Sequence, residues 1–379
     1  MDETLINHIR EFNDLIFNSD ICKQYQNYIF VYTPTKVGST TLVTSLRLSI
    51  LAEFVTIHVH DENMLSILTN YKNVHNITIN DIINYNSMIG KNVYVIDIYR
   101  TPIERKISEF FENIETFHFN SSVEDLNNFN INKLIKRFNN IFQFIGNGDY
   151  FFEKYNNQID PNQPFDFDNK YLIIQKENIT FIKLRLQDSH LWSTILSNIF
   201  KREIVIVDDY KTGNKKVGNI YSKFKEEYKI PSNFLSEIQN DKFFIYYNSF
   251  EEQQIYLNKW NNQMTDEYKC YTLDEYNLYL EISKENAHTA PTQHLHYLDI
   301  GCICSNCSNK RKACFNKVKN GENHNIEIVH DKINTELLAK NKKNMFNIIK
   351  QIKRISQNRM GIAPSNKSEG FNMSGIINS

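Results

Sequence analysis

The stretch YIFVYTPTKVGSTTLVTSLRLSI, residues 28–50, decides the fold. Its apolar start predicts a buried strand over 28–34, and the pattern after it predicts a helix from Ser39 to about Leu51. A tight loop with a lysine, a glycine and several hydroxyl residues joins the two. Backbone N–H groups and the helix dipole favour a bound anion in such a unit. We therefore expect a phosphate site here; the alternative is an ordinary turn whose helix is capped by Ser39 or Thr40.

Short apolar segments alternate with helical patterns along the chain, which indicates βαβ units. Further strands are predicted at 53–60, 92–99 and 203–209, with strand or hairpin material at 171–186. Helices are predicted at 101–114, 124–143 and 191–200, and most of 211–285 is helical in pattern. The sequence therefore predicts an α/β fold, with a three-layer, P-loop-like domain around a central parallel sheet over residues 1–285.

Composition and charge exclude several classes of protein. The 379 residues include 43 basic and 44 acidic ones, for a net charge of −1, so bulk charge predicts no nucleic-acid partner. A hydrophobic fraction of 41% is enough for a buried core and excludes global disorder. No apolar run approaches the roughly 20 residues that span a bilayer, and the N-terminus lacks the pattern of a signal peptide. We expect a cytoplasmic protein; the oligomeric state stays open.

The region after residue 285 differs in composition. Six cysteines are too few for a disulfide framework in a chain of this length. Four of them fall close together and supply thiolates suited to a tetrahedral, structural Zn²⁺ site: Cys302, Cys304, Cys307 and Cys314. Reduced cytosolic thiols are the alternative. We expect this cluster and a basic amphipathic helix to form an extension over 286–360, followed by a disordered tail over 361–379.

The basic helix is predicted at 334–360, with apolar residues on one face and Lys and Arg largely opposite. Its favoured interpretation is a helix that docks on the main domain and exposes its basic face. Peripheral contact with anionic lipid or polysaccharide is the alternative.

A second segment, VYVIDIYRTPIERKISEFFENI (93–114), strengthens the phosphate hypothesis. Arg100 ends a predicted strand and Ser108 lies two turns into the next helix, so a guanidinium and a hydroxyl can close on one phosphate. The alternative treats Arg100 and Arg105 as solvated charges at a helix start. The first loop is not a Walker A motif, because Lys36 precedes Gly38 instead of following it.

Together the two segments resemble the sulfotransferase superfamily. In that superfamily a K-x-G-[ST]-[ST] loop holds the 5′-phosphosulfate of 3′-phosphoadenosine 5′-phosphosulfate (PAPS), and R-x7-S holds its 3′-phosphate. The detail is most similar to the family of capsular polysaccharide synthesis proteins, which shares KVGST and the P-I-x-R-x-I-S-x-F-F-E-N pattern. A weaker likeness follows in FIKLRLQDSHLWSTIL, where Gln187 replaces the usual acid, and in residues 214–225. The resemblance covers roughly residues 25–260.

The resemblance implies a role for each matching residue. The 5′-phosphosulfate would be held by Lys36, Val37, Gly38, Ser39, Thr40 and Thr41. The 3′-phosphate would be held by Arg100 and Ser108. Lys36 would also act in catalysis, by following the bridging oxygen as charge develops there.

A general base is the remaining requirement, and histidine is suited to that work near neutral pH. With a strand period of two, His58 and His60 share one face of the predicted strand 53–60, and His60 lies at its carboxyl end. Sulfotransferases that act on uronic-acid hydroxyls similarly carry His-x-His near the end of the second strand. We predict His60 as the base and His58 as second choice, with Asp61 and Glu62 as alternatives or as partners of the histidine.

The sequence thus favours a PAPS-dependent sulfotransferase that acts on a hydroxyl of a carbohydrate or polysaccharide; the acceptor stays unidentified. Phe and Tyr residues in 115–170 are candidates to stack on sugar rings. Two rivals stay open: a P-loop nucleotide kinase or NTPase that uses ATP and Mg²⁺, and an inactive binding protein with the sulfotransferase fold. Asn- and Lys-rich composition is typical of an AT-rich microbial or viral genome, so host cytoplasm is the expected location in the viral case.

Overall fold

The structure is a computed structural model. It describes residues 3–17, 24–50, 53–62, 77–119, 122–146, 148–155, 163–207, 216–266, 268–277, 279, 280 and 283. The predicted cysteine cluster, basic helix and tail lie outside the described residues, as does the boundary near residue 285. Within the described ranges, no helix is both long and apolar enough to cross a membrane.

A five-stranded sheet forms the centre of the structure, in the order β2-β1-β3-β5-β4. Its strands are β1 (Asn27–Tyr32), β2 (Phe54–Val59), β3 (Asn92–Tyr99), β4 (Tyr171–Lys176) and β5 (Ile179–Arg185). The neighbours β2, β1, β3 and β5 run parallel, and only the edge strand β4 is antiparallel to its neighbour. The prediction of a central parallel sheet is therefore confirmed for four of the five strands, with a hairpin over 171–186.

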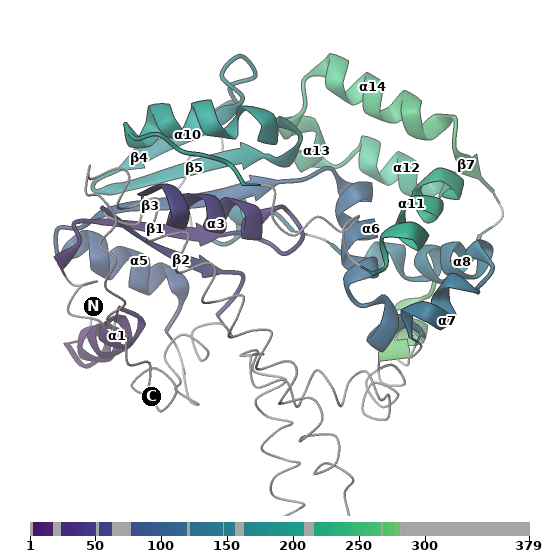
Figure 1. The fold of residues 1–379 in the computed structure, drawn as a ribbon, viewed down its shortest axis with the longest axis horizontal. Coiled ribbons are helices and arrows are strands. Elements are labelled where there is room, and N and C mark those ends of the chain that lie inside the picture. The colour runs from purple at the N-terminus through teal and green to yellow at the C-terminus, as the bar shows by residue number, and fades with distance from the viewer. Residues whose placement is uncertain are drawn as a thin grey trace, which may run out of the picture.

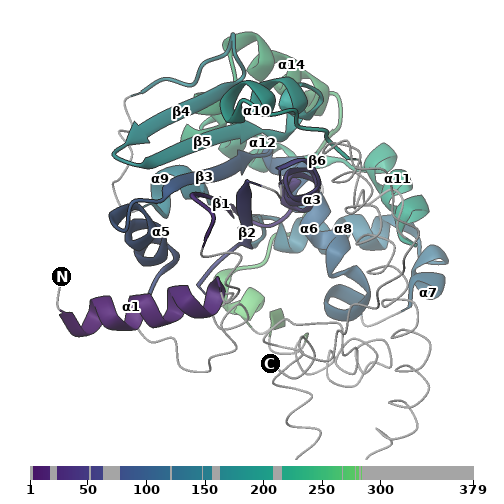
Figure 2. The ribbon, with the colours of Figure 1, turned by 60° about the vertical axis from the view of Figure 1, so that its left-hand side comes forward.

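Helices cover both faces of this sheet (Figures 1 and 2). They are α1 (Glu3–Ile16) and α5 (Ile79–Met88) on one face, and α3 (Ser39–Ile50) and α10 (Trp192–Phe200) on the other. Alternation along β1 explains the arrangement, since Phe30 is buried in the cluster with α1 and α5 while Val31 is buried in the cluster with α3 and α10. The expected α/β architecture with helical layers on both sides of the sheet is present.

A helical lobe lies beyond the carboxyl ends of the parallel strands (Figure 1). It contains α6 (Pro102–Glu112), η1 (Ile114–Phe119), α7 (Val123–Asn127), α8 (Ile131–Ile141), η2 (Phe142–Phe144), α11 (Gly218–Glu227), α12 (Ser232–Gln239), α13 (Lys242–Tyr247) and α14 (Phe250–Asn261). Shorter elements are α9 (Tyr150–Glu153), η3 (Leu186–Leu191), β6 (Ile230–Pro231) and β7 (Met264–Thr265). Pro102 occupies the first turn of α6, as predicted.

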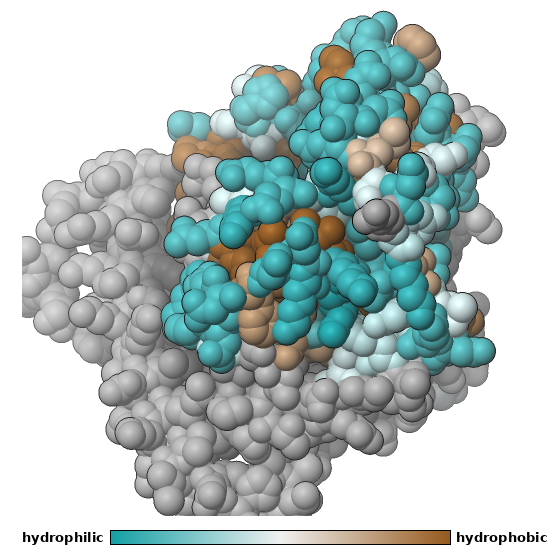
Figure 3. Space-filling model, turned by 90° about the vertical axis from the view of Figure 1, so that its right-hand side faces the viewer, coloured by the Kyte–Doolittle hydropathy of each residue, from teal (hydrophilic) through white to brown (hydrophobic). Residues whose placement is uncertain are grey.

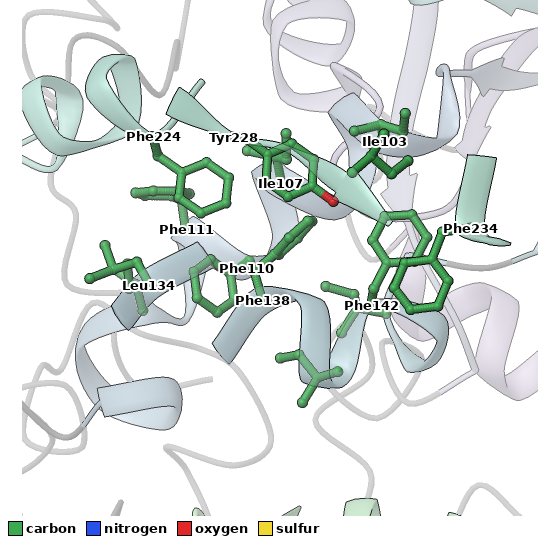
Figure 4. Close-up of a cluster of buried hydrophobic side chains, with 14 of the residues drawn as sticks. Ile103, Ile107, Phe110, Phe111, Leu134, Phe138, Phe142, Phe224, Tyr228 and Phe234 are labelled. Atoms are coloured by element: carbon green, nitrogen blue, oxygen red, sulfur yellow. The ribbon is translucent and has the colours of Figure 1, made fainter. Parts of the chain in front are cut away.

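The lobe has an aromatic core of its own (Figure 4). The Phe110 ring from α6 meets the Phe138 ring from α8 edge-on at 5.3 Å, and Phe142 stacks on Phe234 at 4.5 Å. Such ring pairs add to the stabilisation from apolar burial. The outer surface of the lobe is mostly hydrophilic, with apolar residues gathered in a limited central area (Figure 3). The lobe is therefore a packed unit that holds α6 firmly against the edge of the sheet.

The strand predicted at 203–209 is wrong over its described part, 203–207. The segment runs beside α3, and serine hydroxyls of that helix accept its backbone N–H groups. Val205 donates to Ser49 Oγ and Val207 donates to Ser45 Oγ, both at 3.0 Å. Apolar alternation looked like a strand, but the backbone partners are side chains instead of a neighbouring strand.

The single helix predicted at 124–143 is divided into α7 and α8. Asn128 caps the end of α7, and the Asn130 side chain accepts the Asn132 N–H at 2.9 Å to start α8. Asparagine favours such caps because its side chain competes for backbone hydrogen bonds. The asparagine-rich composition therefore sets this break.

A buried ion network ties the sheet to the segment that carries α9. The Lys183 Nζ lies 2.6 Å from both Asp97 Oδ2 and Asp149 Oδ2, and the lysine and Asp97 side chains are fully buried. Thr33 Oγ1 donates to Asp97 Oδ1 at 2.7 Å, and the Tyr247 hydroxyl donates to Asp149 Oδ1 at 3.0 Å. Burial raises the pKa of Asp97, which Lys183 opposes. The network thus joins β1, β3, β5 and α13.

A second ion cluster ties β5 to α14. The fully buried Arg185 guanidinium holds both carboxylate oxygens of Glu252, at 2.6 and 2.9 Å, and Asp188 Oδ2 at 2.5 Å. The Trp192 indole N–H donates to the Arg185 carbonyl at 3.1 Å. These residues belong to the segment with the weaker family likeness, and the contacts give them a structural role.

Replacing Lys183 with Met should lower the free energy of unfolding by about 3–5 kcal/mol, because two carboxylates would stay buried without their cation. Urea denaturation measures this change. The double variant Lys183→Met/Asp97→Asn should recover part of the loss. Arg202→Met, which removes an exposed ion pair with Glu53, is the control and should have a much smaller effect. Equal stability of the Lys183→Met and Arg202→Met variants would contradict this role of the network.

Candidate active site

The loop between β1 and α3 has an unusual backbone. Lys36 has φ +63° and Gly38 has φ +90°, with Val37 between them. A Cβ at position 38 would lie 2.7 Å from the Leu186 side chain, so only glycine fits. A lysine in the left-handed region costs about 1–3 kcal/mol and is characteristic of functional sites. Alternation of this kind also occurs in backbone nests that bind anions.

The start of α3 completes the loop. Ser39 is the first helical residue and is buried, and Thr40 and Thr41 are half-buried beside it. The first N–H groups of a helix have no partner within that helix, and the helix dipole favours negative charge there. The predicted phosphate-binding residues of this loop are thus gathered around one helix N-terminus.

Arg100, at the end of β3, is joined directly to this loop. Its Nη1 donates to the Lys36 carbonyl oxygen at 2.8 Å, and Tyr221 of α11 is close enough to act on its pKa. The guanidinium therefore bridges the loop and the helical lobe. The alternative of Arg100 and Arg105 as solvated charges is wrong, since Arg100 is half-buried and Arg105 is only 8% exposed.

Arg105 is a site residue that the sequence did not reveal. It donates from Nη1 to the Gly148 carbonyl at 2.9 Å, and its charge contributes to lowering the pKa of His60. Nothing in the local pattern distinguishes it from an exposed arginine of a first helical turn. Its burial depends on the lobe that folds over α6, which only the tertiary structure shows.

Ser108 is buried on α6, two turns after Arg100. In the part of the chain that the structure describes, no hydrogen bond joins its hydroxyl to Arg100. The two members of the R-x7-S pattern thus belong to one strand–helix unit without direct contact. Their joint hold on a phosphate stays a prediction.

His60 follows β2 directly, and its ring has a defined orientation. Its Nδ1 lies 2.7 Å from the Thr33 carbonyl oxygen, which can only accept, so we assign the proton to Nδ1 and the lone pair to Nε2. Burial lowers the pKa of His60, and the bond to Thr33 and the charge of Asp61 partly oppose that shift. The imidazole is therefore neutral at pH 7, as a general base must be.

His58 lies beside His60, with ring centroids 4.5 Å apart. The predicted face is confirmed, since Phe54 on the same face packs with α3 while Ile57 packs with α1 and α5. Burial lowers the pKa of His58 to about 3, further than is suited to proton transfer near neutral pH. The choice of His60 as the base stays a prediction.

The two acids after His60 have different surroundings. Glu62 accepts the Tyr32 hydroxyl at 2.9 Å and lies 3.8 Å from the Lys154 ammonium. The negative charge of Asp61 opposes the effect of burial, which lowers the pKa of His60. Asp61 therefore acts electrostatically on His60, whereas Glu62 is engaged with Tyr32 and Lys154.

A direct ion pair at Lys36 was not expected from the sequence. Its Nζ lies 2.8 Å from Glu112 Oε2 at the end of α6. The two residues are 76 positions apart, so only the packing of α6 beside the loop brings them together.

A cavity of about 180 Å³ opens beside the carboxyl end of β3. Arg100, Arg105, Lys106, Asp149 and Asp241 line it together with apolar side chains. The Lys106 ammonium donates to backbone carbonyls at the end of α8, and burial lowers its pKa to about 7. The cavity thus has charged groups of both signs next to Arg100, which bonds the Lys36 carbonyl of the loop.

Five of the twelve Phe and Tyr residues expected to stack on sugars are core residues. Buried ones within 115–170 are Phe138, Phe142, Phe151, Tyr155 and Phe165. Tyr150 is half-buried. Burial and the charge of Asp61 raise its pKa, and the charge of Arg105 opposes that rise. Tyr150 is therefore one of the half-buried aromatic residues of this segment that stay candidates for contact with a ligand.

The candidate zinc ligands Cys302, Cys304, Cys307 and Cys314 lie outside the described residues, so the zinc hypothesis stays a prediction. Comparison with known proteins finds no family model, no curated protein and no solved structure that matches the chain.

The half-buried His58 should make the protein sensitive to acid. Its pKa is about 3 when folded, against an ordinary histidine value of 6.5, so between these pH values the unfolded chain binds a proton that the folded chain does not. The free energy of unfolding should fall as pH falls through this window, by at most about 1.4 kcal/mol per pH unit from this group. In His58→Leu the slope of unfolding free energy against pH should be shallower between pH 6 and 4 (about one proton less). Identical slopes in both proteins would contradict the assignment.

Proposed function

We propose that the protein is a sulfotransferase that moves a sulfuryl group from PAPS to a hydroxyl, most readily one on a carbohydrate. One observation carries the proposal: Lys36, His60 and Arg100 come from three adjacent strands and meet around one loop. Arg100 bonds the Lys36 carbonyl and His60 bonds the Thr33 carbonyl, at 2.8 and 2.7 Å. Ligands of open α/β sheets bind at this carboxyl edge.

The loop and the start of α3 support the 5′-phosphosulfate role. Lys36 supplies a mobile positive charge, and the N-terminal N–H groups of α3 supply donors with a favourable dipole. In group transfer of this kind, most of the catalytic effect comes from positioning and from neutralising the leaving phosphate. Lys36 is suited to follow the oxygen that becomes negative as the sulfur–oxygen bond breaks.

Arg100 supports the 3′-phosphate role. A guanidinium has five N–H donors in a planar fork, and the bond to the Lys36 carbonyl uses one of them. A phosphate can therefore be held by the remaining donors, with α6 starting next to it.

His60 supports the chemical step. As the acceptor oxygen bonds to sulfur, the hydroxyl proton would pass to His60 Nε2, while the sulfur–oxygen bond to the 5′-phosphate breaks and its electron pair stays on the phosphate. The Thr33 carbonyl holds Nδ1–H, so the imidazolium formed keeps a hydrogen bond to that oxygen. In this proposal an acceptor would approach from the side of the cavity beside Arg100, where Arg105 and Tyr150 lie near each other.

A nucleotide kinase is the second candidate, and one observation favours it. Asp61 and Glu62 follow β2, and Glu112 contacts Lys36, so carboxylates surround the loop. Mg²⁺ bound to a nucleotide prefers carboxylate oxygens. The ligand that stabilises the protein therefore distinguishes the two functions.

Thermal unfolding should be shifted upward by 3′,5′-adenosine bisphosphate without metal, and much less by ATP with Mg²⁺. At a ligand concentration about 100 times the dissociation constant, the stabilisation is about 2.7 kcal/mol. Lys36→Met should lose most of the shift, because it removes a phosphate ligand. His60→Ala should keep the shift but lose sulfuryl transfer to carbohydrate hydroxyls, because the histidine serves the acceptor.

Stabilisation by ATP with Mg²⁺ alone would contradict the sulfotransferase proposal and favour the kinase. Full transfer activity in His60→Ala would show that another group is the base.

A further inference from the structure

We propose that Glu112 is a displaceable partner of Lys36: it holds the ammonium while the loop is empty, gives it up to a bound phosphate, and so lowers the affinity of the loop for anions. The inference rests on the proposed function only in taking Lys36 as an anion ligand. It assigns to the last residue of α6 a role in setting how tightly the site binds.

The contact itself is close but accessible. Lys36 Nζ and Glu112 Oε2 are 2.8 Å apart, and the two side chains are 19% and 32% exposed. A pair with this exposure is weaker than a buried one, since water still reaches both groups. An incoming anion can therefore compete for the lysine.

The position of Glu112 makes the contact with Lys36 favourable for the carboxylate. Glu112 is the final residue of α6, where the helix dipole disfavours negative charge. The Lys36 ammonium offsets that disadvantage. Once a phosphate takes the lysine, the carboxylate stays at an unfavourable helix end without the Lys36 ammonium beside it. Binding of a phosphate therefore has a free-energy cost, the loss of the Lys36–Glu112 contact, which is absent while the loop is empty.

The geometry of the loop confines the exchange to side chains. Lys36 has its backbone fixed at φ +63°, and Arg100 holds its carbonyl oxygen at 2.8 Å. Only the four-carbon stem has to reorient between Glu112 and the start of α3. Bonds from the ammonium to carboxylate and to phosphate are both charge-assisted, but the first N–H groups of α3 are further donors for the phosphate, so the exchange can proceed without loop rearrangement.

Neutralising the carboxylate should therefore tighten anion binding. In Glu112→Gln the lysine is released without deletion of side-chain volume, so a phosphate no longer has to displace a carboxylate from it. We expect about a three- to tenfold higher affinity, the scale of one partly exposed charge interaction.

Isothermal titration of the full chain tests this with two probes, inorganic pyrophosphate and 3′,5′-adenosine bisphosphate. Glu112→Gln should bind both more tightly than wild type. Glu53→Gln is the matched control: it makes the same charge change in an ion pair with Arg202 near the start of β2, away from the loop, and should not alter either affinity. In Lys36→Met/Glu112→Gln the gain over Lys36→Met should disappear, because the carboxylate acts through the lysine.

Unchanged or weaker pyrophosphate binding in Glu112→Gln would overturn the inference. A gain in affinity from Glu112→Gln that persists in the Lys36→Met background would also overturn it, since Glu112 would then act on the anion directly. Failure of all variants to bind pyrophosphate would overturn it as well. If pyrophosphate binding tightens as expected while 3′,5′-adenosine bisphosphate does not bind, the inference stands and the sulfotransferase proposal fails.

Discussion

The ion network of Lys183 with Asp97 and Asp149 is the interaction on which the rest of the structure depends. A fully buried ammonium between two carboxylates, each at 2.6 Å, can exist only if β3, β5 and the turn before α9 are fixed together. Asp97 also accepts the Thr33 hydroxyl, which sets where β1 ends and the loop begins. Breaking a buried pair leaves an uncompensated charge, so the network constrains the edge of the sheet more strongly than apolar packing alone.

The candidate site follows from that constraint. The Thr33 carbonyl bonds the His60 ring. Three residues later the loop adopts its left-handed conformation at Lys36, and Arg100 joins that turn to β3. The helical lobe then covers this edge through α6, which brings Arg105 and Glu112 beside the loop. The strands of the sheet thus position Lys36, His60 and Arg100. The lobe adds the charges of Arg105 and Glu112 beside them. In our proposal, the same charges that bind phosphate are balanced by carboxylates when the site is empty.

Much of the fold could be predicted from the sequence because local patterns and tertiary packing agree there. The strands predicted at 28–34, 53–60 and 92–99 correspond to β1, β2 and β3, and their apolar patterns are local signals. The segment 203–207 was predicted wrongly, since its hydrogen bonds run to serines of α3 and leave no trace in its own alternation. Arg105 and Glu112 were missed because their burial and ion pairing arise between elements distant in sequence. The family likeness and the zinc hypothesis stay predictions.

The most direct test of the account compares the affinities for 3′,5′-adenosine bisphosphate and adenosine 5′-monophosphate, which differ by the 3′-phosphate assigned to Arg100. Wild type should prefer the bisphosphate by at least about tenfold, the scale of one charged hydrogen bond at about 1.5–3 kcal/mol. Arg100→Met should remove that preference, and the surface variant Arg202→Met should keep it. Equal affinities of wild type for the two nucleotides would contradict the central claim that this edge of the sheet is a PAPS site.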